Sequence, residues 1–162
     1  MGFIKKGKEA IHCLKLMQFR DISMNAISSI CGLRACSSVG NIYMGQELHA
    51  EIIIKGLINS HFLTIGSSLV DMYAKCGMLE EAHDMHNKIA DRDVVTWTSL
   101  ITGYAEHGYG EAAFDCLKCM ESQGVSPDAI SFICSLKACA SITSFDMGFQ
   151  LHSHIVMKGF ER

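Results

Sequence analysis

The chain has 162 residues, a formal net charge of −3 at pH 7, 49% hydrophobic residues and a single proline. This weakly acidic composition excludes a nucleic-acid binder that works mainly through a basic surface, so any such binding must rest on local base contacts and a few lysines. The longest purely aliphatic run is the three isoleucines at 52–54, which excludes a membrane span.

Helical periodicity runs along the chain, and turns that mostly carry glycine divide it into five segments. Residues 1–25 hold the end of a first segment, and 26–62, 63–93 and 94–128 form the next three; 129–162 is a fifth, cut short. The spacing predicts helices over 26–36, 42–55, 66–75 and 79–89, with two more inside 94–128. Gly56 is expected to end the second of these helices. No alternation typical of β-strands interrupts the pattern.

The sequence repeats itself at an offset of 103 residues. Comparing 8–59 with 111–162 position by position gives 22 identities in 52 positions. AIS at 26–28 returns at 129–131, and LRAC at 33–36 returns as LKAC at 136–139. A period of this length exceeds one supersecondary unit and divides into three helical hairpins. Because such short helices bury their apolar faces only against neighbours, the pattern predicts an all-α solenoid of antiparallel helix-turn-helix repeats.

Three sequence motifs are similar to those of a known family: LVDMYAKCG at 69–77, RDVVTW at 92–97 and LKACAS at 136–141. They resemble the pentatricopeptide repeat family. Segment lengths of 31 residues for 63–93 and 35 for 94–128 resemble its plant subclass, which alternates pure, long and short repeats. The resemblance makes 1–25 and 94–128 pure-type, 26–62 and 129–162 long-type, and 63–93 short-type. It implies a right-handed superhelical solenoid.

The resemblance also implies a function: sequence-selective binding of single-stranded organellar RNA, one base per repeat, within a plant RNA editing or processing factor of mitochondria or chloroplasts. In this family, one residue near the start of the first helix and the last residue of the repeat read each base. The implied reading residues are Ser67, Asp93, Thr98, Asp128 and Asn25. The residues implied to sandwich the bases are Thr64, Val95, Ile27 and Ile130.

The chemistry of these side chains suits base reading. An ionised aspartate only accepts hydrogen bonds, so it complements a base edge that offers N–H donors, as guanine and uracil do. A hydroxyl donates or accepts and complements a second edge atom. By resemblance, Ser or Thr combined with Asp implies guanine, so we expect adjacent guanines opposite the third and fourth repeats. Ile30 and Ile133 stand at the first reading position of the long repeats, where an aliphatic group acts as a spacer.

Cysteine and lysine positions allow functional and structural interpretations. Cys116 and Cys119 form a CxxC pair, but six of the eight cysteines recur at the repeat offset, which favours small buried side chains in a reducing compartment. Lys75 and Lys137 suit contacts with phosphate or a solvated helix face equally well.

We also expect structural roles for the histidines and the single tryptophan. His49 and Glu51 match the HxE of zinc deaminases, but no PCxxC follows. His83 and His86 lie three residues apart; we expect an exposed His83 and a partly buried His86 rather than half a metal site. Trp97 is expected to pack between helices rather than to stack on a base. We therefore expect no catalytic residue, metal or cofactor in this chain, with any catalytic domain lying outside it.

The sequence also fits two other interpretations of the chain's function. A protein-binding scaffold of the tetratricopeptide kind fits Trp97 and Leu100, but Ile101 stands where that repeat has glycine. A non-functional fragment would expose apolar stacking faces at both ends, and self-association through these open ends is expected. Other editing or processing factors are further expected partners. Lys15 interrupts the apolar stretch that a signal peptide needs, and we recognise no transit peptide within this chain.

Overall fold

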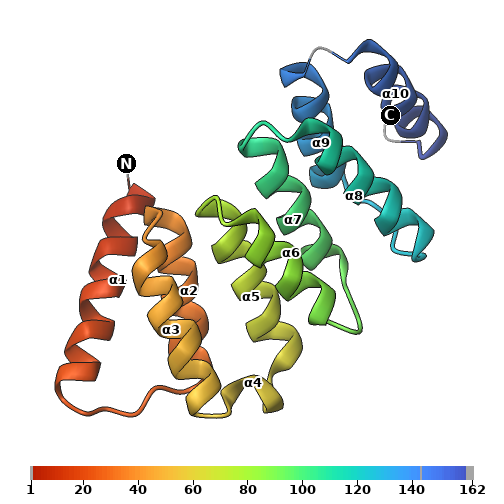
Figure 1. The fold of residues 1–162 in the computed structure, drawn as a ribbon. Helices are drawn as coiled ribbons and strands as arrows, with labels where there is room; N and C mark the ends of the chain where they lie inside the picture. Colours follow the sequence, from red (N-terminus) through yellow and green to blue (C-terminus); the bar gives the residue numbers. More distant parts are fainter. Residues whose placement is uncertain (1, 143, 160–162) are drawn as a thin grey trace. The chain divides into compact units, whose positions relative to one another are not determined.

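A computed structural model describes residues 2–142 and 144–159, and within these ranges the chain forms helices joined by turns, without a β-strand. The all-α class is thus confirmed. Two compact units divide the helices between them, residues 1–91 and 92–162 (Figure 1). The first unit holds α1 (Gly2–Phe19), α2 (Ala26–Val39), α3 (Ile42–Ile54), α4 (Leu57–Ser60), α5 (Phe62–Lys75) and α6 (Leu79–Lys88). The second holds α7 (Val94–Glu106), α8 (Gly110–Ser122), α9 (Ala129–Ser141) and α10 (Phe145–Met157).

Helix positions agree with the periodicity to within a few residues. Gly56 follows α3 with φ of +64°, the left-handed conformation predicted for a helix end. The largest difference lies directly after it, where the single turn α4 was not predicted and α5 begins at Phe62 instead of residue 66. Ile65 explains the early start of α5, because its fully buried side chain belongs to the same apolar face as the rest of the helix.

Each unit is a stack of antiparallel helices in which first helices of successive repeats pack together. In the first unit α2 packs against α1, α3 and α5, and α5 packs against α6. In the second unit α7 packs against α8 and α9, and α10 packs against α9. Burial of apolar side chains at these contacts is the main stabilising term. Fully buried core residues include Leu33, Leu48, Ile52, Leu69 and Met72 in the first unit and Leu100, Ile101, Leu117, Met120 and Leu151 in the second.

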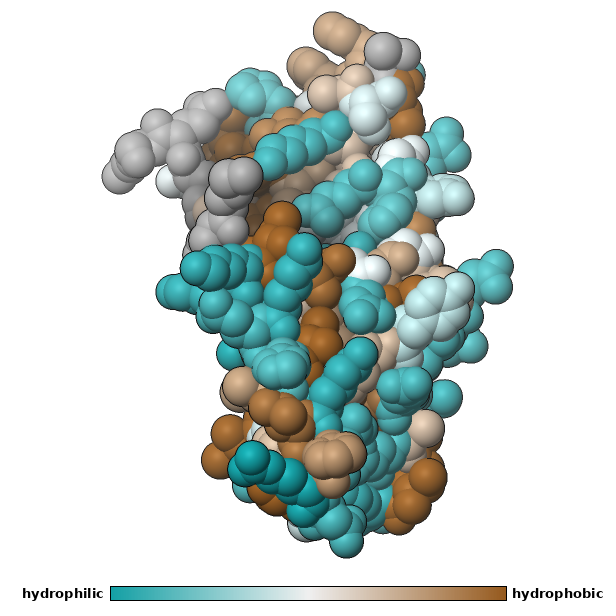
Figure 2. Space-filling view, turned by 90° about the vertical axis from the view of Figure 1, so that its left-hand side faces the viewer, coloured by the Kyte–Doolittle hydropathy of each residue, from teal (hydrophilic) through white to brown (hydrophobic). Residues whose placement is uncertain are grey.

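The first helix of the first unit presents apolar side chains to solvent. Ile4, Leu16 and Phe19 of α1 are all exposed. Figure 2 looks onto this side of the unit and shows apolar surface between hydrophilic side chains. In the part of the chain that the structure describes, no helix is long and apolar enough to cross a bilayer.

The cysteine prediction is confirmed for four residues and wrong for two. Cys36, Cys116, Cys134 and Cys139 are buried, whereas Cys13 and Cys31 are exposed. Cys116 lies on α8, which α7 and α9 both contact, and Cys134 Sγ on α9 lies 3.2 Å from Thr102 Oγ1 on α7. No described helix precedes α1, so nothing covers Cys13 and Cys31 in the way that α7 covers their counterparts.

Gly110 and Gly148 allow a matched test of helix packing. A Cβ at Gly110 would lie 2.6 Å from the carbonyl oxygen of Ala138, a backbone atom that cannot move without shifting α9. We expect Gly110→Ala to lower the free energy of unfolding by about 1–3 kcal/mol. Gly148→Ala, where a Cβ meets nothing within 4 Å, is expected to raise it by about 0.5–1 kcal/mol. Urea unfolding followed by far-UV circular dichroism measures both, and equal effects would contradict the close α8–α9 approach.

Candidate nucleic-acid interface

Three of the predicted reading residues begin a helix. Asn25, Asp93 and Asp128 are the N-caps of α2, α7 and α9. Their Oδ1 atoms accept hydrogen bonds from the backbone N–H three residues later, at 2.9, 2.9 and 2.8 Å respectively. These bonds satisfy a backbone donor that the helix leaves unpaired, and they hold each side chain in one orientation. The last residue of each of these three repeats is therefore positioned by the helix that follows it.

Asp128 is linked to Thr98 through a serine that sequence reasoning missed. Ser131 Oγ donates to Asp128 Oδ1 at 2.7 Å and lies 2.8 Å from Thr98 Oγ1. Because the only hydroxyl hydrogen of Ser131 goes to the carboxylate, the Thr98 hydroxyl must be the donor to Ser131. With its hydrogen used in this way, the Thr98 oxygen can act towards any further group only as an acceptor. The structure thus brings together one predicted pair, Thr98 on α7 and Asp128 at the start of α9.

The other predicted pair lies on helices of different units, and each member is positioned by its own helix. Ser67 on α5 is half-buried, and its Oγ donates to the carbonyl oxygen of Leu63 at 2.7 Å. Asp93 is exposed, and its Oδ1 accepts from Thr96 Oγ1 at 2.7 Å as well as from the Thr96 backbone. The chemistry matches the first pair: a carboxylate fixed through Oδ1 and a hydroxyl whose hydrogen is already used.

The predicted sandwiching residues are all exposed at the start of first helices. Ile27, Val95 and Ile130 are 73%, 62% and 57% exposed, and each is the second residue of its helix. Thr64 is also exposed but is the third residue, because α5 begins earlier than predicted. Exposed aliphatic groups gain free energy when a flat apolar surface such as a base covers them. Among the spacer isoleucines, Ile30 is half-buried and Ile133 is exposed.

The two lysines considered for contact with phosphate have different surroundings. Lys75 Nζ forms an ion pair with Asp71 at 2.8 Å, and the second oxygen of Asp71 accepts from Ser37 Oγ at 3.0 Å. Asp71 therefore joins α5 to α2, and Lys75 pairs with it on the same helix. Lys137 is exposed on α9.

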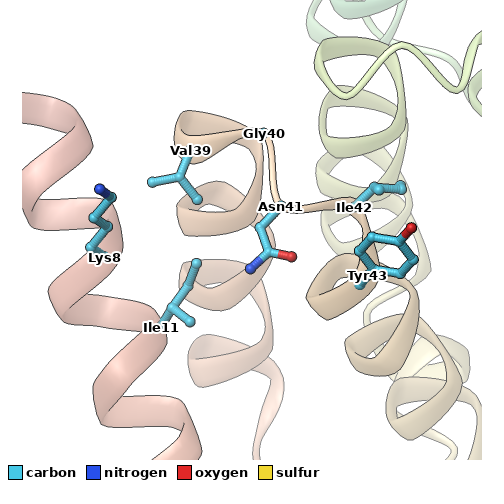
Figure 3. Close-up of a pocket in the computed structure, with 7 residues that line it drawn as sticks. All are labelled: Lys8, Ile11, Val39, Gly40, Asn41, Ile42 and Tyr43. Carbon is cyan, nitrogen blue, oxygen red and sulfur yellow. The ribbon is translucent and has the colours of Figure 1, made fainter.

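A hollow beside α1 has no comparable set of reading groups. It is lined by Lys8, Ile11, Val39, Gly40, Asn41, Ile42 and Tyr43 (Figure 3). Lys8 is the only charged residue in this lining. The Asn41 side chain accepts from the Met44 backbone N–H at 3.2 Å and so serves to cap α3. We assign no function to this hollow.

The two cysteines of the CxxC pair differ in burial, and so do the two histidines of α6. In the described part of the chain, no group of three or more His, Cys, Asp or Glu side chains is placed to hold a metal ion. Cys116 is buried, which raises the pKa of its thiol to about 12, whereas Cys119 is exposed. His83 is exposed as expected, but His86 is only 1% exposed, so the prediction of partial burial was wrong. His86 belongs to the buried face of α6 together with Ala82 and Met85, and α6 packs against α5.

His49 joins two repeats through a hydrogen bond with Tyr73. Its Nδ1 lies 2.8 Å from the Tyr73 hydroxyl, which joins α3 to α5. Glu51 bonds to Lys55 at 2.7 Å and to Gln18 at 3.2 Å. Burial, reinforced by the positive charge of Lys88, lowers the pKa of His49 below its ordinary value of 6.5.

This lowered pKa predicts that acid weakens the first unit. Below pH 6.5 the unfolded chain takes up a proton at His49 that the folded chain binds only at lower pH. The contribution of His49 to stability is therefore complete above pH 6.5 and falls as the pH decreases. We expect the loss of unfolding free energy between pH 7.5 and 5 to be smaller in His49→Gln. His12→Gln, at an exposed histidine of α1, should keep the loss seen in the unmodified chain.

Comparisons with known proteins agree on one family. A family model described as PPR repeat family matches residues 92–141, and one described as PPR repeat matches 67–94. The chain is 39% identical over 147 residues to the chloroplastic pentatricopeptide repeat-containing protein At4g18520 of Arabidopsis thaliana, covering 91% of this chain and 24% of that protein. It is 34% identical over 145 residues to the mitochondrial protein At3g53360 of the same plant, covering 90% and 19%. The chain thus spans about a quarter or less of the length of these relatives.

Solved structures show the same fold. The crystal structure of the pentatricopeptide repeat protein PPR10 from maize matches with a TM-score of 0.70 at 22% identity, covering 92% of this chain and 22% of that one. PPR10 in complex with an 18-nt psaJ RNA element matches with a TM-score of 0.55 at 17% identity, covering 97% and 34%. The predicted helical-repeat solenoid is confirmed by this likeness.

Proposed function

Because this chain belongs to the pentatricopeptide repeat family, we propose that it binds single-stranded RNA, with one base facing each repeat. The observation that carries the proposal is the hydrogen-bonded chain from Thr98 through Ser131 to Asp128. It lies beside the exposed aliphatic side chains of Val95 and Ile130. Polar groups held in one orientation next to apolar groups that can cover a base are what reading of an unstacked base requires.

The geometry favours guanine opposite the fourth repeat, 94–128. The capping bonds occupy Asp128 Oδ1, so Oδ2 accepts from the base, and the Thr98 oxygen is a second acceptor. Guanine presents two adjacent donors on its pairing edge, N1–H and the N2 amino group. Uracil presents one N–H donor, and adenine and cytosine present an amino group beside an acceptor. Two acceptors side by side therefore complement guanine best.

Ser67 and Asp93 support the same base opposite the third repeat, 63–93. The hydroxyl hydrogen of Ser67 and Oδ1 of Asp93 are both used within the protein. Because a hydroxyl residue and an aspartate repeat the residue types of Thr98 and Asp128, we propose adjacent guanines opposite these two repeats. Asn25 ends the first repeat, 1–25, with a side chain that both donates and accepts.

The biological setting follows from the relatives. Those described above are chloroplastic and mitochondrial, and PPR10 has been solved with an RNA element. We propose that this chain is the recognition segment of a plant organellar RNA editing or processing factor, acting with other such factors.

Binding of short single-stranded RNAs tests the proposal. Fluorescence anisotropy at low salt, with labelled RNAs that differ only at two central positions, should show tighter binding to GG than to AA. Val95→Asp should weaken binding to the GG probe about ten-fold, since a covered base contributes about 1–3 kcal/mol. Ile54→Asp changes an aliphatic residue on α3 that is even more exposed than Val95 and should leave binding unchanged. Equal affinity for GG, AA and a duplex of the same sequence would refute base reading.

A further inference from the structure

The first helices of the four repeats that begin within this chain, α2, α5, α7 and α9, share a register. In each of them the sandwiching position is followed three residues later by the first reading position. The seventh residue after the sandwiching position lies on the same side of the helix, because at about 100° per residue the three positions fall within about 60° of one another. These seventh residues are Arg34, Asp71, Thr102 and Lys137.

In the two repeats with a hydroxyl at the reading position, the seventh residue contacts the preceding or following first helix. One oxygen of Asp71 on α5 accepts from Ser37 Oγ of α2 at 3.0 Å, and the other pairs with Lys75. Thr102 Oγ1 on α7 lies 3.2 Å from Cys134 Sγ of α9. Both side chains therefore contribute to the packing of one first helix against another.

The other two repeats, 26–62 and 129–162, have isoleucine at the reading position and a cation at the seventh. Arg34 and Lys137 are both exposed. No acidic residue stands three or four positions before or after either of them, so neither can form an ion pair along its own helix. Among the residues that the structure describes, neither side chain forms an ion pair or a hydrogen bond.

Neighbouring first helices leave this position open. The following first helix, α5, packs against α2, and Arg34 is exposed with α5 in place. The preceding first helix, α7, packs against α9, and Lys137 is exposed with α7 in place. The two copies thus show the cation accessible beside a following and beside a preceding repeat.

We propose that Arg34 and Lys137 bind phosphates of the RNA backbone, so that the two isoleucine repeats hold the strand that the other repeats read. The proposal rests on the RNA binding proposed above. Ile30 and Ile133 form no hydrogen bond with a base, and the cation one helical turn further along the same face supplies an attraction that does not depend on sequence. Arginine and lysine both bind phosphate, the first through a planar fork and the second as a point charge.

Salt dependence of RNA binding tests the two cations. With the GG probe between about 50 and 200 mM salt, each lost phosphate contact lowers the slope of log affinity against log salt by about 0.7. Arg34→Gln and Lys137→Gln should therefore each make the loss of affinity over this range about two- to three-fold smaller, and each should weaken binding to the GG and AA probes by the same factor. Lys15→Gln removes an exposed lysine of α1, a second helix, and should leave the slope unchanged.

Neutral linkages in the RNA locate the phosphates. A single methylphosphonate linkage is moved along the GG probe, and its effect on the affinity of each variant is measured. The neutral linkage should lose its effect at one place in Arg34→Gln and at another, three nucleotides away, in Lys137→Gln. The reason is that the variant and the linkage remove the same contact, and the two isoleucine repeats are three repeats apart. Circular dichroism should show both variants folded, as expected for exposed positions.

The outcomes separate this proposal from base reading. An unchanged salt slope in both variants, or an equal decrease in Lys15→Gln, would overturn the phosphate contacts and leave a preference for GG over AA intact. A lower slope in Arg34→Gln and Lys137→Gln without any preference for GG in the unmodified chain would support the phosphate contacts and refute base reading. Absence of RNA binding would overturn both.

Discussion

Replacing Asp128 by asparagine is expected to change the preferred base opposite the fourth repeat from guanine to adenine. The cap uses Oδ1, which an amide retains, while an NH₂ group takes the place of Oδ2. The pair then offers one donor and one acceptor, from the new amide and from Thr98, and these complement N1 and the N6 amino group of adenine. A two-point contact of this kind discriminates by about 1–3 kcal/mol, so the ratio of the two affinities should change about ten-fold or more.

Competition binding with RNAs that carry G, A, C or U at the single position measures this change. Asparagine caps a helix about as well as aspartate, so the unfolding free energy should stay nearly constant. Asp91→Asn removes the same charge from an exposed residue outside the proposed site, and it controls for the loss of repulsion from phosphate. A uniform gain in affinity for all four RNAs in both variants would show that Asp128 acts only through its charge.

Replacing Trp97 by alanine is expected to destabilise the second unit by about 3–5 kcal/mol. The indole is only 4% exposed, and α7, which carries it, packs against both α8 and α9. Truncation therefore leaves a large cavity within the apolar core. Since Trp97 is the only tryptophan, unfolding must be followed by circular dichroism rather than by intrinsic fluorescence.

Phe145→Ala is the matched control for an aromatic truncation in the same unit. Its ring is 85% exposed, so the expected change in unfolding free energy is within about 0.5 kcal/mol. If Trp97→Ala left stability unchanged and weakened only RNA binding, the tryptophan would be a base-stacking residue, and its assignment to the core would be wrong.

Most of the fold could be predicted because each helix carries its own signals. Leu100 and Ile101 repeat the apolar spacing of α7, and Asp93 marks its start. The turn α4 could not be predicted in this way, since four residues are too few to show helical periodicity. Exposure of Cys13 was missed for a different reason: identity between repeats does not specify which neighbour covers each copy.

The individual residues of the candidate site could be proposed from the sequence, but the hydrogen bonds that connect them could not. A hydroxyl three residues after the N-cap is a recognisable capping signal, present at Ser28, Thr96 and Ser131. That signal could have drawn attention to Ser131. Its contact with Thr98, however, depends on the packing of α9 against α7, which residue spacing does not determine.

The double use of the N-cap position restricts how such a protein can acquire new targets. At Asp93 and Asp128 the carboxylate caps a helix through one oxygen, and in our proposal the other oxygen reads a base. Only a few short polar residues perform the first task well, so only those can be exchanged without loss of stability. The set of residues that can read a base at this position is therefore limited by helix capping before it is limited by contacts with RNA. New specificities are reached most readily by exchange between aspartate and asparagine, and changes to other residues require stability gained elsewhere in the array.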